Sequence, residues 1–148
     1  MPYPRRDCPW EALHEAGFTS VLSLHCGLSY NPAPMTRLAA VFLEDLVDGN
    51  APSRPQKELS AIRQAVNTVV ARLEAGQGVV VHCYGGRGRT GTVIGCVLRR
   101  LGYGPHEVVD YLDRLHTARG KGGWPESPWQ EQTVREYVRS SATSDDPR

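Results

Sequence analysis

A cysteine and an arginine six positions apart, Cys83 and Arg89, enclose the glycine-rich run Tyr84-Gly85-Gly86-Arg87-Gly88. The run follows a short apolar stretch, residues 79–81, which is typical of a buried strand, and it precedes a predicted helix that begins near Thr90. A glycine-rich loop in this place can turn its backbone N–H groups inward and bind an anion. The N-terminus of the following helix adds positive potential at the same point.

The two side chains at the ends of this loop supply complementary chemistry. The positive potential favours the thiolate of Cys83 because it lowers the pKa of the thiol. Arg89 presents a planar guanidinium that can bind two phosphate oxygens at once. A thiolate, an anion-binding loop and a guanidinium together indicate nucleophilic attack on tetrahedral phosphorus. The alternative is a glycine-rich turn that contains a cysteine and an arginine by chance.

The loop resembles the phosphate-binding loop of the protein tyrosine phosphatase superfamily, in which Cys, five residues and Arg stand between a His and a Ser or Thr. Here the flanking residues are His82 and Thr90. The resemblance implies that Cys83 is the nucleophile. It implies that Arg89 and the backbone N–H groups of residues 84–88 bind phosphate. His82 is predicted to be buried and to hold the loop in place by hydrogen bonds, with a general base as the alternative. Thr90 either only caps the helix or also stabilises the thiolate when it departs in the second step.

The family also uses an Asp on a mobile loop to protonate the leaving oxygen. The segment Asp48-Gly49-Asn50-Ala51-Pro52 matches that element, and Asp48 lies 35 residues before Cys83. A flexible turn can close an acid over a bound phosphate, so Asp48 is the predicted general acid. Asp45 and then Glu44 are the alternatives, and Asp48 also suits a purely structural turn beside Gly49. Together with the His-Cys-Tyr-Gly-Gly run, this segment resembles the compact dual-specificity branch, that of the kinase-associated phosphatases.

A third element resembles the part of the family that orients the hydrolytic water through a Gln. Ser127-Pro128 precedes Gln130, which is the predicted residue, and Gln132 is the alternate. An exposed polar residue on an amphipathic helix is the competing interpretation for either one. No counterpart of the tyrosine-bearing loop of the phosphotyrosine-only enzymes is found, which implies a shallower cleft that tolerates several phosphorylated groups.

Several other residues have two interpretations each. Arg87 is either an extra cation for a substrate with more than one phosphate or a solvated side chain. Cys26 follows a strand predicted to run parallel to the one before Cys83, and it is either a redox partner of that thiol or a buried core residue. Arg119 and Lys121 either line the cleft or are solvated. Cys96 lies among apolar residues and is predicted to be core.

The rest of the chain predicts the elements that position these residues. Helical segments are indicated at residues 11–16, 59–73, 90–101, from Pro105 onward and at 128–138. Residues 19–24 alternate as a strand does, residues 78–81 form a buried strand, and residues 38–43 are apolar with mixed propensity. Strands separated by helices predict a single α/β domain, with a mostly parallel sheet of about four to five strands flanked by helices. The domain is expected over residues 1–139, with a flexible tail over 140–148.

Composition narrows the function classes further. Lys plus Arg total 17 and Asp plus Glu total 16, so a broad nucleic-acid-binding or anionic-membrane surface is not expected. No stretch is long and apolar enough to insert in a membrane, and no signal-peptide core is present. The four cysteines form no CxxC pair, so neither a disulfide scaffold nor a metal site is expected, and free thiols suit a cytoplasmic protein. A monomer is expected.

These observations predict a cysteine-dependent phosphomonoester hydrolase of the protein tyrosine or dual-specificity type that needs no cofactor. Its expected partner is a phosphorylated protein or another phosphomonoester. The same mechanism on a phosphoinositide or an RNA 5′-triphosphate is an alternative. A non-catalytic phosphate-binding module and a rhodanese-type sulfurtransferase are further alternatives, but neither would need Asp48 together with Cys83 and Arg89.

Overall fold

The computed structural model describes residues 1–27 and 29–138, so the predicted tail at 140–148 lies outside the described residues. The described chain contains five α-helices, three strands and one 3₁₀ turn. In chain order these are α1 (Trp10–Glu15), β1 (Phe18–Ser23), β2 (Thr36–Arg37), η1 (Val47–Gly49), α2 (Pro55–Glu74), β3 (Gly78–His82), α3 (Gly88–Arg100), α4 (Pro105–Ala118) and α5 (Pro128–Glu136).

The sheet is parallel, with strand order β2-β1-β3. Val21 pairs with Val80 and Ser23 with His82, so β1 and β3 end at the same edge. This confirms the predicted α/β class, although the described sheet has three strands where four to five were expected. The difference lies in the apolar run at residues 38–43, which follows β1 without forming a regular ladder. Its hydrogen bonds to β1 and Leu24 come from Leu38, Val41 and Leu43, at uneven spacing.

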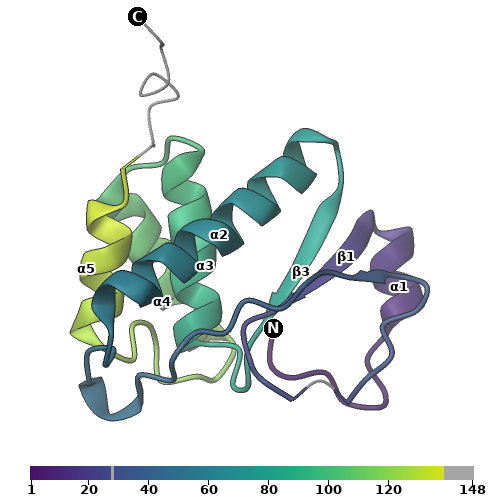
Figure 1. Ribbon diagram of the computed structural model, residues 1–148, viewed down its shortest axis with the longest axis horizontal. Helices are drawn as coiled ribbons and strands as arrows, with labels where there is room; N and C mark the ends of the chain where they lie inside the picture. Colours follow the sequence, from purple (N-terminus) through teal and green to yellow (C-terminus); the bar gives the residue numbers. More distant parts are fainter. Residues whose placement is uncertain (28, 139–148) are drawn as a thin grey trace, which may run out of the picture.

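The helices lie on both sides of the sheet (Figure 1). Helices α2 to α5 gather on one side, and α1 lies on the other. Alternation along β1 divides the core accordingly, because successive side chains point to opposite faces. Leu22 belongs to the large cluster under α2 to α5, and Val21 belongs to the small cluster near α1. Cys96 of α3 is fully buried in the large cluster, as predicted.

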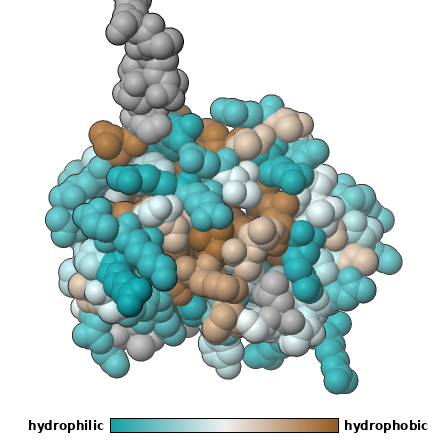
Figure 2. Space-filling model, in the orientation of Figure 1, coloured by the Kyte–Doolittle hydropathy of each residue, from teal (hydrophilic) through white to brown (hydrophobic). Residues whose placement is uncertain are grey.

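The helix ends follow local sequence signals. Both α2 and α4 begin with a proline, whose fixed φ and missing N–H suit the first helical turn. The chain leaves α2 through Gly76 at φ +76°, a left-handed conformation that favours glycine. In Figure 2, apolar side chains reach the surface in the middle of the face over which α2 runs, between polar margins. Within the described residues, no helix has the length and apolarity needed to cross a membrane.

Candidate active site

The 83–89 loop connects the end of β3 to the first turn of α3. Its glycines are required by close packing as well as by backbone shape. Gly86 has φ +71°, and a β-carbon there would collide with the backbone of Met1 and Pro2. A β-carbon at Gly88 would collide with the side chains of Glu126 and Gln130. The loop is therefore held between the N-terminal segment and the chain that leads into α5.

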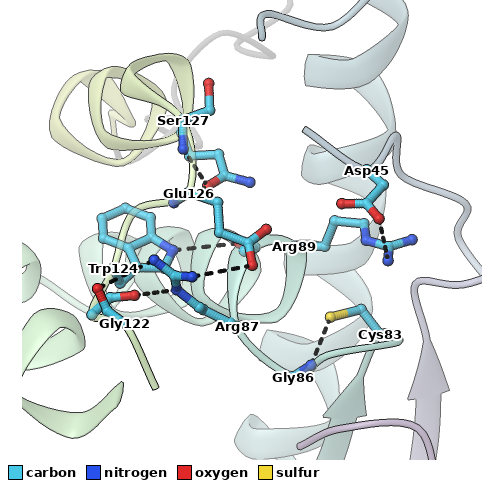
Figure 3. A network of polar contacts seen from close by, with 12 residues as sticks. Asp45, Cys83, Gly86, Arg87, Arg89, Gly122, Trp124, Glu126 and Ser127 are labelled. Atoms are coloured by element: carbon cyan, nitrogen blue, oxygen red, sulfur yellow. Dashed lines mark hydrogen bonds and ion pairs between the residues drawn. The ribbon is translucent and has the colours of Figure 1, made fainter. Parts of the chain in front are cut away.

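The sulfur of Cys83 lies inside this loop, and its side chain is only 2% exposed. It accepts a hydrogen bond from the Gly86 N–H at 3.2 Å and one from the Thr90 hydroxyl at 3.1 Å (Figure 3 draws the first). Burial is the largest single influence on the pKa of the thiol and raises it. Hydrogen bonds from the Thr90 side chain and backbone and from Gly86, together with the charge of Arg89, outweigh burial and lower the pKa overall. These donors therefore favour the thiolate form of Cys83.

His82 supports the loop from behind. Its ring is fully buried, and its Nδ1 lies 3.0 Å from the Cys83 carbonyl oxygen. Because a carbonyl can only accept, Nδ1 carries the proton, and Nε2 accepts from the Tyr30 hydroxyl at 2.5 Å. Burial lowers the pKa of His82 and raises that of Tyr30 to about 12, so the imidazole stays neutral and the phenol keeps its proton.

Arg89 shares a small cavity of about 130 Å³ with Cys83. Its guanidinium is 8% exposed and lies 3.6 Å from the Asp45 carboxylate through Nη2 (Figure 3). Its Nη1 donates to Nδ1 of His25 at 3.3 Å. Tyr84, Arg87 and Glu126 also line the cavity. The structure therefore brings the predicted nucleophile and the predicted guanidinium into one pocket.

Arg87 points away from the sulfur and joins the loop to the segment before α5 (Figure 3). Its Nε donates to the Gly123 carbonyl, its Nη2 donates to the Gly122 carbonyl at 3.3 Å, and its Nη1 lies 3.8 Å from the Glu126 carboxylate. Neither sequence interpretation of Arg87 describes this arrangement. The half-buried side chain directs its donors to the neighbouring segment instead.

The candidate acids lie on the 44–53 loop. Asp45 lines the cavity, whereas Asp48 is exposed at φ +66° in the η1 turn and is not among the lining residues. Glu44 faces the base of the loop, where its carboxylate accepts from the backbone N–H and the hydroxyl of Ser53. In addition, the Glu44 N–H donates to the buried carboxylate of Glu58 at 2.9 Å. Glu44 therefore anchors the loop and does not face the sulfur.

The two candidate glutamines differ in burial and in the residues they contact. Gln130 is 1% exposed, and its Oε1 accepts from the N–H groups of Glu126 and Ser127, which caps α5. Its Nε2 faces Gly88 of the 83–89 loop, at the place where a β-carbon would be. Gln132 is exposed and donates to Glu136, away from the cavity. The structure thus brings Gln130, and not Gln132, to the loop.

Comparison with known proteins agrees with this geometry. The profile of a family described as "Polymorphic toxin system, DSP-PTPase phosphatase" matches residues 6–103, about two thirds of the chain. The chain belongs to this DSP-PTPase family. The matched residues include both the 44–53 loop and the 83–89 loop, but they end before Gln130. The predicted resemblance is confirmed.

Individual relatives agree in sequence or in fold. "Putative tyrosine phosphatase 067L" of Invertebrate iridescent virus 3 is 31% identical over 98 residues, 61% of this chain, and the aligned part spans 40% of the length of that relative. The catalytic domain of the PP-IP phosphatase SIW14 from S. cerevisiae has a TM-score of 0.66 at 21% identity, over 94% of this chain and 79% of that one. PTPMT1, solved with PI(5)P, has a TM-score of 0.66 at 17% identity, and the match covers 92% of this chain and 86% of PTPMT1. Kinase-associated phosphatase has a TM-score of 0.62 at 17% identity, and the match covers 93% of this chain and 82% of that phosphatase.

The other candidates of this DSP-PTPase chain are also placed by the structure. Cys26 is exposed and unpaired, so the interpretation that it is a core residue is wrong. Arg119 reaches the loop, where its Nη1 donates to the Gly86 carbonyl at 3.5 Å, whereas Lys121 is exposed. Among the described residues, no group of three or more His, Cys, Asp or Glu side chains could hold a metal ion.

Sequence reasoning missed four residues of the site: His25, Tyr30, Glu126 and Ser127. His25 directly follows the end of β1 and its neighbour Leu24, and β1 is the parallel neighbour of the strand before Cys83. Because carboxyl ends of parallel strands meet at one edge, this adjacency was a usable signal. The Ser127 hydroxyl donates to the Asn50 carbonyl at 2.7 Å and so joins α5 to the 44–53 loop. No local pattern indicates that contact.

Proposed function

We propose that this chain is a cysteine-dependent phosphomonoester hydrolase, of the protein tyrosine or dual-specificity phosphatase type. One observation supports this above the others: the buried Cys83 sulfur receives donors from Thr90 and Gly86 and shares a cavity with Arg89. A binding module would need the donors and the guanidinium, but it would have no use for a thiol with a lowered pKa.

In the first step, the Cys83 thiolate attacks phosphorus, and the P–S bond forms as the P–O ester bond breaks. Arg89 and the N–H groups of residues 84–88 hold the three non-bridging oxygens, where charge accumulates in the transition state. The Asp45 carboxylate, now 3.6 Å from Arg89, gives up that guanidinium to the incoming phosphate. The leaving oxygen receives a proton from a general acid.

We assign the general acid to Asp48. The 44–53 loop is held on both sides of the cavity, by Asp45 at Arg89 and by Asn50 at Ser127, next to the lining residue Glu126. Asp48 lies between these two attachments. Asp45 contacts the guanidinium that would hold the phosphate, so we give it the role of releasing Arg89, and the role of acid falls to Asp48. A small movement of the η1 turn would bring Asp48 over the phosphate, as lid loops do in other enzymes.

In the second step, water attacks phosphorus, the P–S bond breaks and inorganic phosphate leaves. The Asp48 carboxylate accepts the proton that the water loses, so the acid is regenerated. The Thr90 hydroxyl donates to the sulfur as its negative charge returns. We assign to Nε2 of Gln130, which lies beside Gly88, the role of holding the water oxygen near the phosphorus.

A phosphorylated protein is the proposed substrate. A phosphoinositide is the alternative, since two solved structures of similar fold are a PP-IP phosphatase and an enzyme solved with PI(5)P. The engaged donors of Arg87 favour the protein, because a second phosphate would have to displace Gly122, Gly123 and Glu126. No long basic surface for RNA is expected from the near-neutral charge. Phosphate release from a phosphopeptide, a phosphoinositide and an RNA 5′-triphosphate separates these substrates.

We also propose that the enzyme acts as a monomer in a reducing cytoplasm. Its four cysteines are unpaired, which suits a compartment that keeps thiols reduced.

The description of the family refers to polymorphic toxin systems, so the chain is a candidate toxic module of such a system. Growth arrest of a bacterial host on expression of the wild type, but not of Cys83→Ser, is the expected result. Equal growth with both would remove the toxin assignment.

The function itself is tested with an aryl phosphate. Cys83→Ser should reduce turnover to below about 1% of wild type, since a serine hydroxyl is not ionised at neutral pH and no base adjoins it. It should still bind orthovanadate or inorganic phosphate, because Arg89 and the loop remain. Cys26→Ser, at an exposed cysteine outside the cavity, is the matched control and should keep wild-type turnover. Turnover by Cys83→Ser near the wild-type rate would disprove the mechanism.

A further inference from the structure

Tyr84 is an unusual residue for the mouth of a phosphate pocket. It follows directly after Cys83, which is 2% exposed, yet the Tyr84 side chain is 67% exposed and lines the same cavity. Its backbone position is fixed, because its carbonyl accepts from the Tyr3 N–H at 2.9 Å. An aromatic ring is thus presented to solvent beside the Cys83 sulfur.

The Tyr84 ring has an aromatic neighbour that is also part of the site. The ring centroids of Tyr84 and His25 are 5.5 Å apart and the planes are tilted by 46°. His25 is held in turn by Arg89, which donates to its Nδ1, and by the edge-on ring of Tyr3 at 5.9 Å. The Tyr3 hydroxyl is itself fixed, since it donates to the Gly27 carbonyl at 2.9 Å. Tyr84 and His25 together form what we call the aromatic shelf.

The lining of the cavity indicates what would lie beside this shelf. Cys83 and Arg89 line the cavity of about 130 Å³ together, so the phosphoryl group would lie between them. When the phosphoryl group occupies the cavity, the group on its ester oxygen must lie at the mouth. Tyr84 of the aromatic shelf lines this cavity, as does Asp45 of the 44–53 loop. His25 adjoins it through its ring contact with Tyr84 and its hydrogen bond from Arg89.

We propose that the aromatic shelf stacks against the ring of an aryl phosphate, so that Tyr84 and His25 select phosphotyrosine over phosphoserine in protein substrates. This inference rests on the proposed function and specifies its substrate. Aromatic rings gain from offset or tilted contact beyond the area they bury. A phosphoserine would place a single methylene group and its peptide backbone at the mouth and leave the Tyr84 ring exposed. The ring of an inositol is not planar and offers no π-face to the shelf.

The test compares two peptides that differ only in phosphotyrosine or phosphoserine at one position. The quantity of interest is the ratio of their kcat/KM values, because differences in leaving-group chemistry cancel when variants are compared with wild type. Tyr84→Ala should lower the phosphotyrosine-to-phosphoserine ratio about tenfold, and Tyr84→Phe should restore it. Tyr111→Ala, which removes an exposed tyrosine of α4, is the matched control and should keep the ratio. Tyr84→Leu keeps an apolar side chain without a π-face and should lower the ratio as Tyr84→Ala does.

Binding in the Cys83→Ser background provides a second readout that involves no bond cleavage. There, Tyr84→Ala should weaken phosphotyrosine-peptide binding about tenfold and leave phosphoserine-peptide binding close to its original value. An unchanged ratio, or an equal loss for both peptides, would overturn the shelf while leaving the phosphatase intact. Wild-type protein that hydrolyses neither peptide would contradict the proposed function instead. In that case the binding comparison still decides whether the shelf recognises an aryl ring.

Discussion

The Thr90 hydroxyl lies 3.1 Å from the Cys83 sulfur, and it reaches across the loop from the first turn of α3. In the proposed mechanism, this side chain therefore serves the sulfur both when it attacks and when it leaves. In the resting enzyme it helps to lower the pKa of the thiol against the opposing effect of burial. In the second step it donates to the sulfur as the P–S bond breaks.

Thr90→Val removes this donor with little change in volume and should raise the pKa of Cys83. The pH at which iodoacetamide alkylates the thiol at half its maximal rate should therefore move upward, and the acidic limb of the pH–rate profile should move with it. Thr90→Ser keeps a hydroxyl and should keep the wild-type midpoint. The measurement is alkylation rate against pH, followed by mass spectrometry at Cys83. Identical midpoints for the valine variant and wild type would show that Gly86 and Arg89 stabilise the thiolate without Thr90.

Asp48→Asn should reduce kcat by ~10²–10⁴ with a poor leaving group such as a tyrosyl oxygen, the range for loss of a positioned proton donor. With a nitrophenolate of low pKa, which departs without a proton, the loss should be small. Asp45→Asn should show no such dependence on the leaving group. If the two variants exchange these behaviours, the proton comes from the residue that already lines the cavity.

Gln130→Glu separates the two roles of that side chain. A carboxylate still accepts from the N–H groups of Glu126 and Ser127, so the α5 cap persists, but the Nε2 donor that faces Gly88 is lost. The second step should slow by at least about tenfold, so stopped-flow traces with an aryl phosphate should show a product burst followed by a slow steady state. Gln132→Glu, on the exposed face of α5, should show wild-type traces. A burst of the same size in both variants would contradict a specific role for Gln130.

His82 should make the stability of the fold depend on pH. Burial lowers its pKa below the ordinary value of 6.5, so the unfolded chain binds a proton at a pH where the folded protein does not. The contribution of neutral His82 to the free energy of unfolding is fully present above pH 6.5, and it is lost as the pH falls towards the pKa of His82 in the folded protein. The free energy of unfolding, measured in urea between pH 7 and 5, should decrease more steeply for wild type than for His82→Gln. His106→Gln, at an exposed histidine of α4, should keep the wild-type slope.

The proposed nucleophile and its guanidinium partner could be predicted from the sequence because they lie close together in the chain. Cys83 begins the five-residue connection between β3 and α3, and Arg89 lies in the first turn of α3, so the backbone of this segment brings both side chains to one centre. His82 and Thr90 could be predicted for the same reason, since each is next to this segment in the chain. The helices were also predictable, because apolar spacing and the prolines at Pro55, Pro105 and Pro128 are local signals.

Residues that reach the site from distant segments could not be placed in this way. A periodic pattern does not say whether Gln130 or Gln132 faces the loop; that depends on the capping box at Ser127 and on how α5 packs beside Gly88. The order of Asp45 and Asp48 along the chain likewise does not show which carboxylate lines the cavity. That depends on the attachment of the 44–53 loop at Arg89 and Ser127.

The sequence by itself therefore determined the family, the α/β class and the loop that carries Cys83 and Arg89, since these depend on short-range backbone geometry and on the spacing of residues within single elements. Tertiary structure alone decided which acidic residue lines the cavity and that Arg87 binds the segment before α5. It also decided that the ring of His25 contacts the ring of Tyr84 and accepts from Arg89. Each of these outcomes is set by contacts between residues far apart in the chain, and the free energy of such a contact depends on packing and desolvation that no single segment specifies.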